Sequence, residues 1–146
     1  MDALQPILRR ELTAAAPPRL LIGGPLQPLA GADDRCCDPE AALTEPFTRR
    51  YDLGVFWDEG RLAPGETRRL LARLRDLYCA RVLAVAGPGA ALVDANEWRA
   101  LGYARETRLA GETALYVFDV RHYKPVPDWF NPKNWAHPEL WDKYRW

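Results

Sequence analysis

Two adjacent carboxylates, Asp58 and Glu59, are the side chains of this 146-residue chain best placed to do chemistry. They follow an apolar run, residues 51–57, whose β-branched and aromatic side chains predict a strand buried on both faces. In open α/β sheets, ligands bind beyond the carboxyl ends of the strands. Beside Trp57, the pair could act as a general base toward an acceptor substrate. The alternative is a solvated loop ahead of a helix, where the helix dipole favours negative charge.

Glycines follow two other predicted strands. Residues 19–24 form a short buried run that ends in Gly23 and Gly24, where a phosphate-binding protein places its glycine-rich turn. Residues 87–89, Gly-Pro-Gly, close the apolar run 81–86. They could cradle an anion or form a tight turn.

The remaining predicted elements place these residues in one α/β domain. A helix beginning at Pro64 joins the strand 51–57 to the strand 81–86, and a crossover of this length makes the two strands parallel. Its apolar side repeats at helical spacing through Leu70, Leu71, Leu74, Leu77 and Tyr78. The other expected elements are a helix over 2–16, strands over 19–24 and 35–37, one helical turn within 39–50, and a hairpin of strands over 103–109 and 113–121. Asp94 and Glu97 have capping-box spacing, which predicts a helix over 95–101.

Composition excludes several classes of function. Twenty basic and twenty acidic residues cancel, so the chain lacks the basic surface expected of a protein that binds nucleic acid or an anionic membrane. No apolar run approaches the roughly 20 residues of a membrane span. The first residues also lack the layout of a signal peptide. We therefore expect a cytoplasmic protein with no membrane contact.

The cysteines and histidines indicate neither a disulfide framework nor a metal site. Cys36 and Cys37 are neighbours, and Cys79 is expected to end the long helix, so there is no CxxC motif. His122 and His137 lack ligand spacing to a cysteine pair, and we predict structural thiols and no metal. The chain contains no serine, which excludes the G-x-S-x-G nucleophile motif.

The order of these elements resembles that of class I S-adenosylmethionine-dependent methyltransferases over residues 1–121. YDLGVFWDEG followed by PGETRRLLARLRDL is similar to the family's fourth strand and following helix, and WRALGYARETRLAGETALYVFDV to its closing helix and hairpin. The resemblance implies a three-layer, Rossmann-like, mostly parallel sheet with an antiparallel C-terminal hairpin. It also implies S-adenosylmethionine held by Gly23, Gly24 and Asp38, the last through the ribose hydroxyls. The whole chain also resembles short bacterial proteins of unknown function, which implies no activity.

The sequence departs from that family where the cofactor would bind. The family's first turn carries an acid and spaced glycines, whereas Pro25 and Pro28 here remove two amide donors. Asp38 precedes a proline, and an Asp in that position is also an ordinary turn initiator. Only residues 39–50 remain for a helix and a further strand over the adenine, which is too few. We expect the sheet to be reduced at one edge and no cofactor to be bound.

Residues 122–146 form a C-terminal extension of unusual composition. It holds four prolines and four of the six tryptophans, Trp129, Trp135, Trp141 and Trp146. Disorder goes with few aromatic residues, so we expect the extension to dock. It could dock on its own domain, on another subunit or protein, or on the bases of single-stranded nucleic acid. The neutral net charge argues against the last.

Taken together, these features predict an α/β domain over residues 1–121 and an aromatic extension over 122–146. Our leading hypothesis for function is a non-catalytic binding or scaffolding module related to the methyltransferases. The alternative is a small S-adenosylmethionine-dependent methyltransferase that places its acceptor by Trp57, Asp58 and Glu59.

Overall fold

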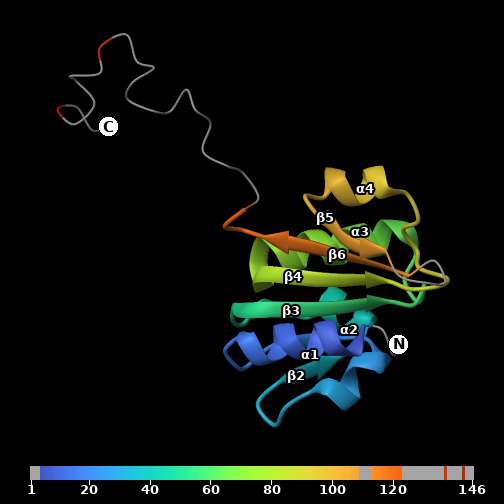
Figure 1. Ribbon diagram of the computed structural model, residues 1–146. Coiled ribbons are helices and arrows are strands. Elements are labelled where there is room, and N and C mark those ends of the chain that lie inside the picture. The colour runs from blue at the N-terminus through green and yellow to red at the C-terminus, as the bar shows by residue number, and fades with distance from the viewer. Residues whose placement is uncertain (1–3, 109–112, 123–136, 138–142, 144–146) are drawn as a thin grey trace.

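A strand–helix–strand unit lies at the centre of the sheet (Figure 1). The computed structural model describes residues 4–108, 113–122, 137 and 143. Strands β3 (Tyr51–Asp58) and β4 (Cys79–Ala86) are parallel and lie next to each other, with Gly54 opposite Val82. Both strands are almost wholly buried, as their continuous apolar runs predict.

The rest of the sheet extends on both sides of this unit in the order β2-β1-β3-β4-β6-β5. Strands β1 (Leu20–Ile22) and β2 (Arg35–Cys37) continue the parallel half. Strands β5 (Ala104–Arg108) and β6 (Ala114–Asp119) form the predicted antiparallel pair, and the turn predicted between them falls outside the described residues. Between β2 and β3 the chain contains only helix α2 (Pro39–Thr44) and a loop. This arrangement makes β2 the edge strand and confirms the reduction predicted there.

Helices cover the two faces of the sheet and complete the three predicted layers (Figure 1). Helix α1 (Gln5–Ala14) and the 3₁₀ helix η1 (Gly24–Leu29) pack on one face, where Leu4, Leu8, Leu12 and Leu26 join the core. Helices α2, α3 (Pro64–Arg73) and α4 (Ala95–Ala100) pack on the other face. On that face the Trp98 ring stacks on Tyr116 at 4.2 Å.

Two details of the long helix differ from the prediction. After Arg73 the helix widens into a π-helical turn, η2 (Leu74–Tyr78), closed by a hydrogen bond from the Cys79 amide to the Leu74 carbonyl. The wider turn shifts the helical spacing, so Leu77, predicted to face the core, is 41% exposed. Cys79 does not end the helix; it is the buried first residue of β4.

The start of α4 is capped by Asp94 alone. Its carboxylate accepts a hydrogen bond of 2.9 Å from the Asn96 amide, as an N-cap residue does. Glu97 does not complete the predicted capping box, because its side chain forms an ion pair with Arg68 of α3. This pair links the two helices on the same face of the sheet.

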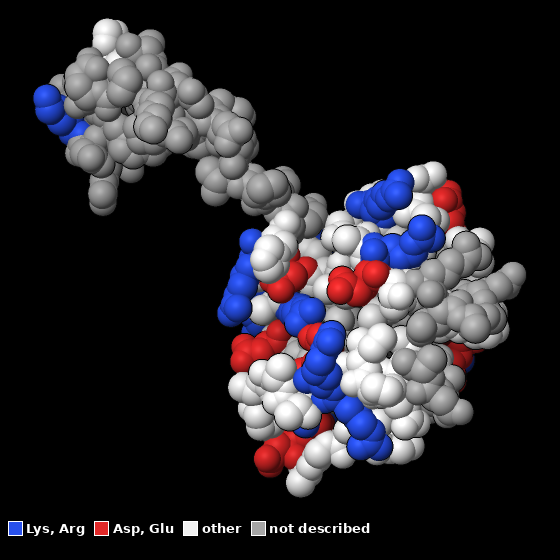
Figure 2. Space-filling view, viewed as in Figure 1, with Lys and Arg blue, Asp and Glu red and all other residues white. Residues whose placement is uncertain are grey.

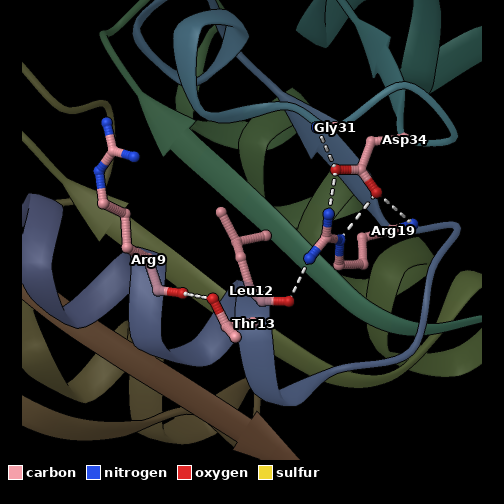
Figure 3. A network of polar contacts seen from close by, with 6 residues as sticks. All are labelled: Arg9, Leu12, Thr13, Arg19, Gly31 and Asp34. Atoms are coloured by element: carbon pink, nitrogen blue, oxygen red, sulfur yellow. Dashed lines mark hydrogen bonds and ion pairs between the residues drawn. The ribbon is translucent and has the colours of Figure 1, made fainter.

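An ion pair that the sequence analysis did not anticipate joins Arg19, directly before β1, to Asp34 in the loop before β2 (Figure 3). The Asp34 carboxylate has no exposed surface and accepts hydrogen bonds from the Arg19 side chain at 2.6 and 2.7 Å. It also accepts from the Gly31 amide at 2.7 Å, and Arg19 donates in addition to the Leu12 carbonyl of α1. The pair therefore holds β2, and with it Asp38, in place against the rest of the fold.

No helix within the described part of the chain has the length and apolar character needed to cross a membrane. On the face shown in Figure 2, basic and acidic side chains are interspersed, in keeping with the equal numbers of the two.

Candidate functional site

Strands β1, β2, β3 and β4 are parallel, so their carboxyl ends lie along one edge of the sheet, the carboxyl edge. This edge brings together the residues singled out in the sequence, which are Gly23 and Gly24 after β1, Asp38 after β2, and Asp58 and Glu59 at the end of β3. His122 follows β6 at the opposite edge. The four tryptophans of the extension lie outside the described residues.

Gly23 has no side chain because the neighbouring strand leaves no room for one. Its φ is 118°, which L side chains rarely adopt, and a Cβ there would lie 3.0 Å from the Trp57 carbonyl oxygen. Its amide donates to the Cys37 carbonyl of β2 at 3.2 Å. The packing of β1 between β2 and β3 thus accounts for this glycine without any ligand.

The segment after Gly23 forms a 3₁₀ helix instead of an open glycine-rich turn. Pro25 and Pro28 of η1 have no amide hydrogen, and the Leu26 amide donates back to the Gly23 carbonyl at 3.2 Å. The Leu26 side chain is fully buried in the core beneath α1. Opening this turn around a ligand would require Leu26 to leave the core.

Asp38 is paired with an arginine from the next loop. Its carboxylate contacts the Arg61 guanidinium at 3.0 Å, and the same guanidinium contacts Glu40 at 3.1 Å. The hydrogen bond that Arg61 donates to Asp38 and the nearby charge of Glu40 raise the pKa of Arg61. The Asp38 backbone begins α2, because its carbonyl accepts from the Ala42 amide at 3.0 Å. The backbone of Asp38 therefore begins a helix, as a turn initiator does, and its side chain pairs with Arg61.

Sequence reasoning missed Arg61. The available signal was its place in the loop after β3, three residues beyond Asp58. Loops that follow parallel strands lie at the same edge of the sheet. A basic side chain in this loop was therefore a candidate partner for the acids that follow β2.

Asp58 holds two loops together. It is only 2% exposed, and its two carboxylate oxygens accept hydrogen bonds from the Gly60 amide at 3.0 Å and from the Ala91 amide at 2.9 Å. The Asp58 carbonyl also accepts from the Gly87 amide at 3.3 Å. Both oxygens that a general base would use therefore bind backbone amides. Glu59, by contrast, is exposed to solvent.

The two loops joined by Asp58 also touch through glycines. Gly60 has a φ of 74°, and a Cβ there would lie 2.1 Å from the Gly89 carbonyl oxygen. Within the second loop the Ala90 amide donates to the Gly87 carbonyl at 3.0 Å, which closes a tight turn. A hollow of about 260 Å³ lies beside this turn, between Gly87 and Tyr116 of β6. Of the two possibilities for residues 87–89, the geometry favours the tight turn.

Burial disfavours the thiolate form of two of the cysteines, Cys37 and Cys79. Burial raises the pKa of Cys37 to about 11 and that of Cys79 to about 12. Thiols of such high pKa carry little thiolate near neutral pH and are poor nucleophiles. Within the described residues, no group of three or more His, Cys, Asp or Glu side chains is arranged to hold a metal ion.

The described residues of the carboxyl edge do not fit S-adenosylmethionine as the sequence resemblance implies. The cofactor turn would need open backbone amides, but η1 contains two prolines and is anchored by Leu26. The ribose hydroxyls would need the Asp38 carboxylate, which Arg61 engages. Between β2 and β3 there is no further strand to close over an adenine ring.

Comparison with solved structures identifies the fold. The N-methyltransferase NodS from Bradyrhizobium japonicum WM9 superimposes with a TM-score of 0.53 at 12% identity, over 80% of this chain and 93% of NodS. The PH0226 protein from Pyrococcus horikoshii OT3 superimposes with a TM-score of 0.50 at 8% identity, over 81% of this chain and 88% of that protein. The chain therefore has a methyltransferase-like Rossmann fold, and at this identity the likeness concerns the fold alone.

A comparison with curated proteins finds no match. A family model does match, and it spans the α/β domain together with the C-terminal extension. Since the match covers residues 2–146, the chain belongs to the family of unknown function DUF6231.

Proposed function

We propose that this protein is a non-catalytic, methyltransferase-like binding or scaffolding module. The observation that carries the proposal is η1, which occupies the position of the cofactor turn. Leu26 is fully buried, and transferring such a side chain to water costs about 1.5 to 3 kcal/mol. A ligand would have to offset this cost and would still find no amide donor at Pro25 or Pro28.

Two further contacts support the proposal. Arg61 lies between Asp38 and Glu40, although an exposed ion pair of this kind contributes little to stability and would yield to a tight ligand. Asp58 uses both carboxylate oxygens to join the loops after β3 and β4. Asp38 and Asp58, two of the side chains expected to bind or react, thus have structural partners, and this supports a role in binding through the surface.

The alternative, a small S-adenosylmethionine-dependent methyltransferase, draws support from two observations. Gly24 has no atom within 4 Å of where a Cβ would stand, and the Asp38 side chain is 62% exposed. On this alternative, Gly23, Gly24 and Asp38 would hold the cofactor, and the acceptor would bind near Glu59.

A calorimetric titration distinguishes the binding module from the methyltransferase. Wild-type protein titrated with S-adenosylmethionine, and in parallel with S-adenosylhomocysteine, is expected to give no saturable heat up to about 1 mM ligand. Thermal unfolding provides an independent check, because a ligand present at 100 times its Kd stabilises the folded state by about 2.7 kcal/mol. Saturable heat at micromolar ligand that disappears in Asp38→Ala would refute the proposal and favour the alternative, for which a screen of methyl acceptors is then the next test.

A further inference from the structure

The amino edge of the sheet, opposite the candidate site, carries most of the exposed large apolar side chains. Four such side chains are exposed among the described residues, Phe47, Leu77, Val93 and Val120. Val93 follows β4 at the carboxyl edge, whereas the other three lie where β3 and β4 begin and β6 ends. Ligands of open α/β sheets bind at the carboxyl edge, so a small-molecule site does not explain apolar exposure at the amino edge.

Two contacts and one sequence neighbour place these side chains on one surface. The Phe47 ring packs edge-on against Tyr78 with centroids 5.6 Å apart, and Leu77 directly precedes Tyr78. The Val120 amide donates to the Ala80 carbonyl at 3.1 Å. We name these five residues, Phe47, Leu77, Tyr78, Ala80 and Val120, the amino-edge strip.

Two hollows continue the amino-edge strip onto the face of the sheet that carries α1. One, of about 340 Å³, is lined by Ala80 and the end of α1, and the other, of about 470 Å³, by Val117 and His122. Both are lined by Arg81, which contacts Glu11 at 2.5 Å and Asp119 at 3.8 Å. Within the described part of the chain, no helix packs on β5 and β6 on this side of the sheet. Figure 1 shows β6 toward the viewer, with α1 below it.

The chain itself supplies an occupant for this surface. β6 ends at Asp119 beside the amino-edge strip, and the 24 residues from 123 to 146 follow. A stretch of that length reaches about 80 Å when extended, enough to cross the whole edge. Its four tryptophans can each bury about 150 to 250 Å². The family model extends to residue 146, so the extension belongs to the same family unit as the domain.

We propose that residues 123–146 pack against the amino-edge strip of their own chain, with tryptophan side chains covering Leu77 and Val120 and entering the hollow beside Ala80. Packing within one chain is favoured over packing between chains, because the short connection through His122 gives the extension a high effective concentration at this edge.

Hydrogen exchange of the full-length protein, followed by mass spectrometry, tests this proposal. Amides of residues 123–146 are expected to exchange at least about tenfold more slowly than unstructured amides. Leu77→Glu and Val120→Glu are each expected to remove most of that protection, since each places a charge under the tryptophans. Val93→Glu is the matched control, an exposed valine at the carboxyl edge that should leave the extension protected. Unchanged protection of β3 and β4 shows that a variant has folded.

Three results would overturn the proposal. The first is exchange of the extension at unstructured rates in the wild-type protein. The second is equal protection of the extension in the variants Val120→Glu and Val93→Glu. The third is protection that develops only at higher protein concentration or only with added single-stranded DNA, because a second copy or a nucleic acid would then be the partner. The proposal does not depend on whether the carboxyl edge binds a cofactor.

Discussion

At the scale of single residues, the two neighbouring carboxylates of the candidate site have different surroundings. Asp58 is buried and binds the amides of Gly60 and Ala91, whereas Glu59 is exposed. Sequence adjacency suggested one reactive pair, but alternate residues of a strand point to opposite sides. The carboxylate that looked reactive in the sequence is a connector between loops.

Replacing Asp58 is therefore expected to lower stability. Asp58→Ala leaves two part-buried amides without their charged acceptor, and we expect a loss of about 2 to 3 kcal/mol in the free energy of unfolding. Urea denaturation measures this loss. The neighbouring Glu59→Ala should change stability by less than about 0.5 kcal/mol. Equal effects of the two substitutions would contradict the connecting role.

The buried pair of Asp34 and Arg19 makes a second prediction. Asp34→Asn leaves the Arg19 guanidinium, which is only 14% exposed, without its counter-charge. Loss of one partner from a buried pair costs about 3 to 5 kcal/mol, and we expect a loss near the lower end because the amide oxygen still accepts a hydrogen bond. The exposed neighbour offers a matched control, Asp33→Asn, whose stability should remain close to wild type.

The same pair predicts how stability depends on pH. Burial alone would raise the pKa of Asp34, but hydrogen bonds from Arg19 and the Gly31 amide outweigh it and lower the pKa below its ordinary value of 3.8. As pH falls, the unfolded chain takes up the proton first, so the contribution of Asp34 is fully present above about pH 5 and is lost as pH falls below 3.8. Urea midpoints of wild type and Asp34→Asn should therefore converge in acid. A constant difference down to the acid limit would refute this assignment.

At the scale of elements, the contact between the loops after β3 and β4 depends on a glycine. Gly60→Ala forces a side chain into a positive φ and against the Gly89 carbonyl, and we expect a loss of more than about 2 kcal/mol. Gly65→Ala is the matched control, because a Cβ in this first turn of α3 meets nothing within 4 Å. That substitution should be neutral or stabilising by up to about 1 kcal/mol. Circular dichroism thermal melts compare the two, and a neutral Gly60→Ala would show that the loops can separate.

Elements whose signal is local could be predicted from the sequence, whereas contacts created by topology could not. The continuous apolar runs of β3 and β4 and the leucine spacing of α3 predicted the central unit and its parallel pairing, and the two last strand-like runs predicted the final antiparallel pair. The π-helical turn was not predicted, because Leu74, Leu77 and Tyr78 keep ordinary α-helical spacing in the sequence and gave no sign of a wider turn. The pairs Arg19–Asp34 and Arg61–Asp38 join residues 15 and 23 positions apart, which become neighbours only once the strands are ordered.

At the scale of the whole molecule, the chain has a methyltransferase-like sheet whose carboxyl edge carries η1 and the pair of Arg61 and Asp38. The candidate site could be located from the sequence, because parallel strands place Gly23, Asp38 and Asp58 at one edge. The contacts that surround these residues could not be predicted, because they depend on the burial of Leu26 and on the position of the Arg61 side chain. A shared fold therefore does not decide activity, which rests on the particular side chains at the site.

Amide resonances of the carboxyl edge, observed by NMR on the full-length protein during addition of S-adenosylhomocysteine, test the central claim most directly. We predict that the amides of Gly23, Gly24, Asp38 and Gly60 keep their chemical shifts up to about 1 mM ligand, because the burial of Leu26 anchors η1 where the cofactor turn would have to open. Saturable shifts confined to these amides would contradict the account and show that the edge opens to receive the cofactor.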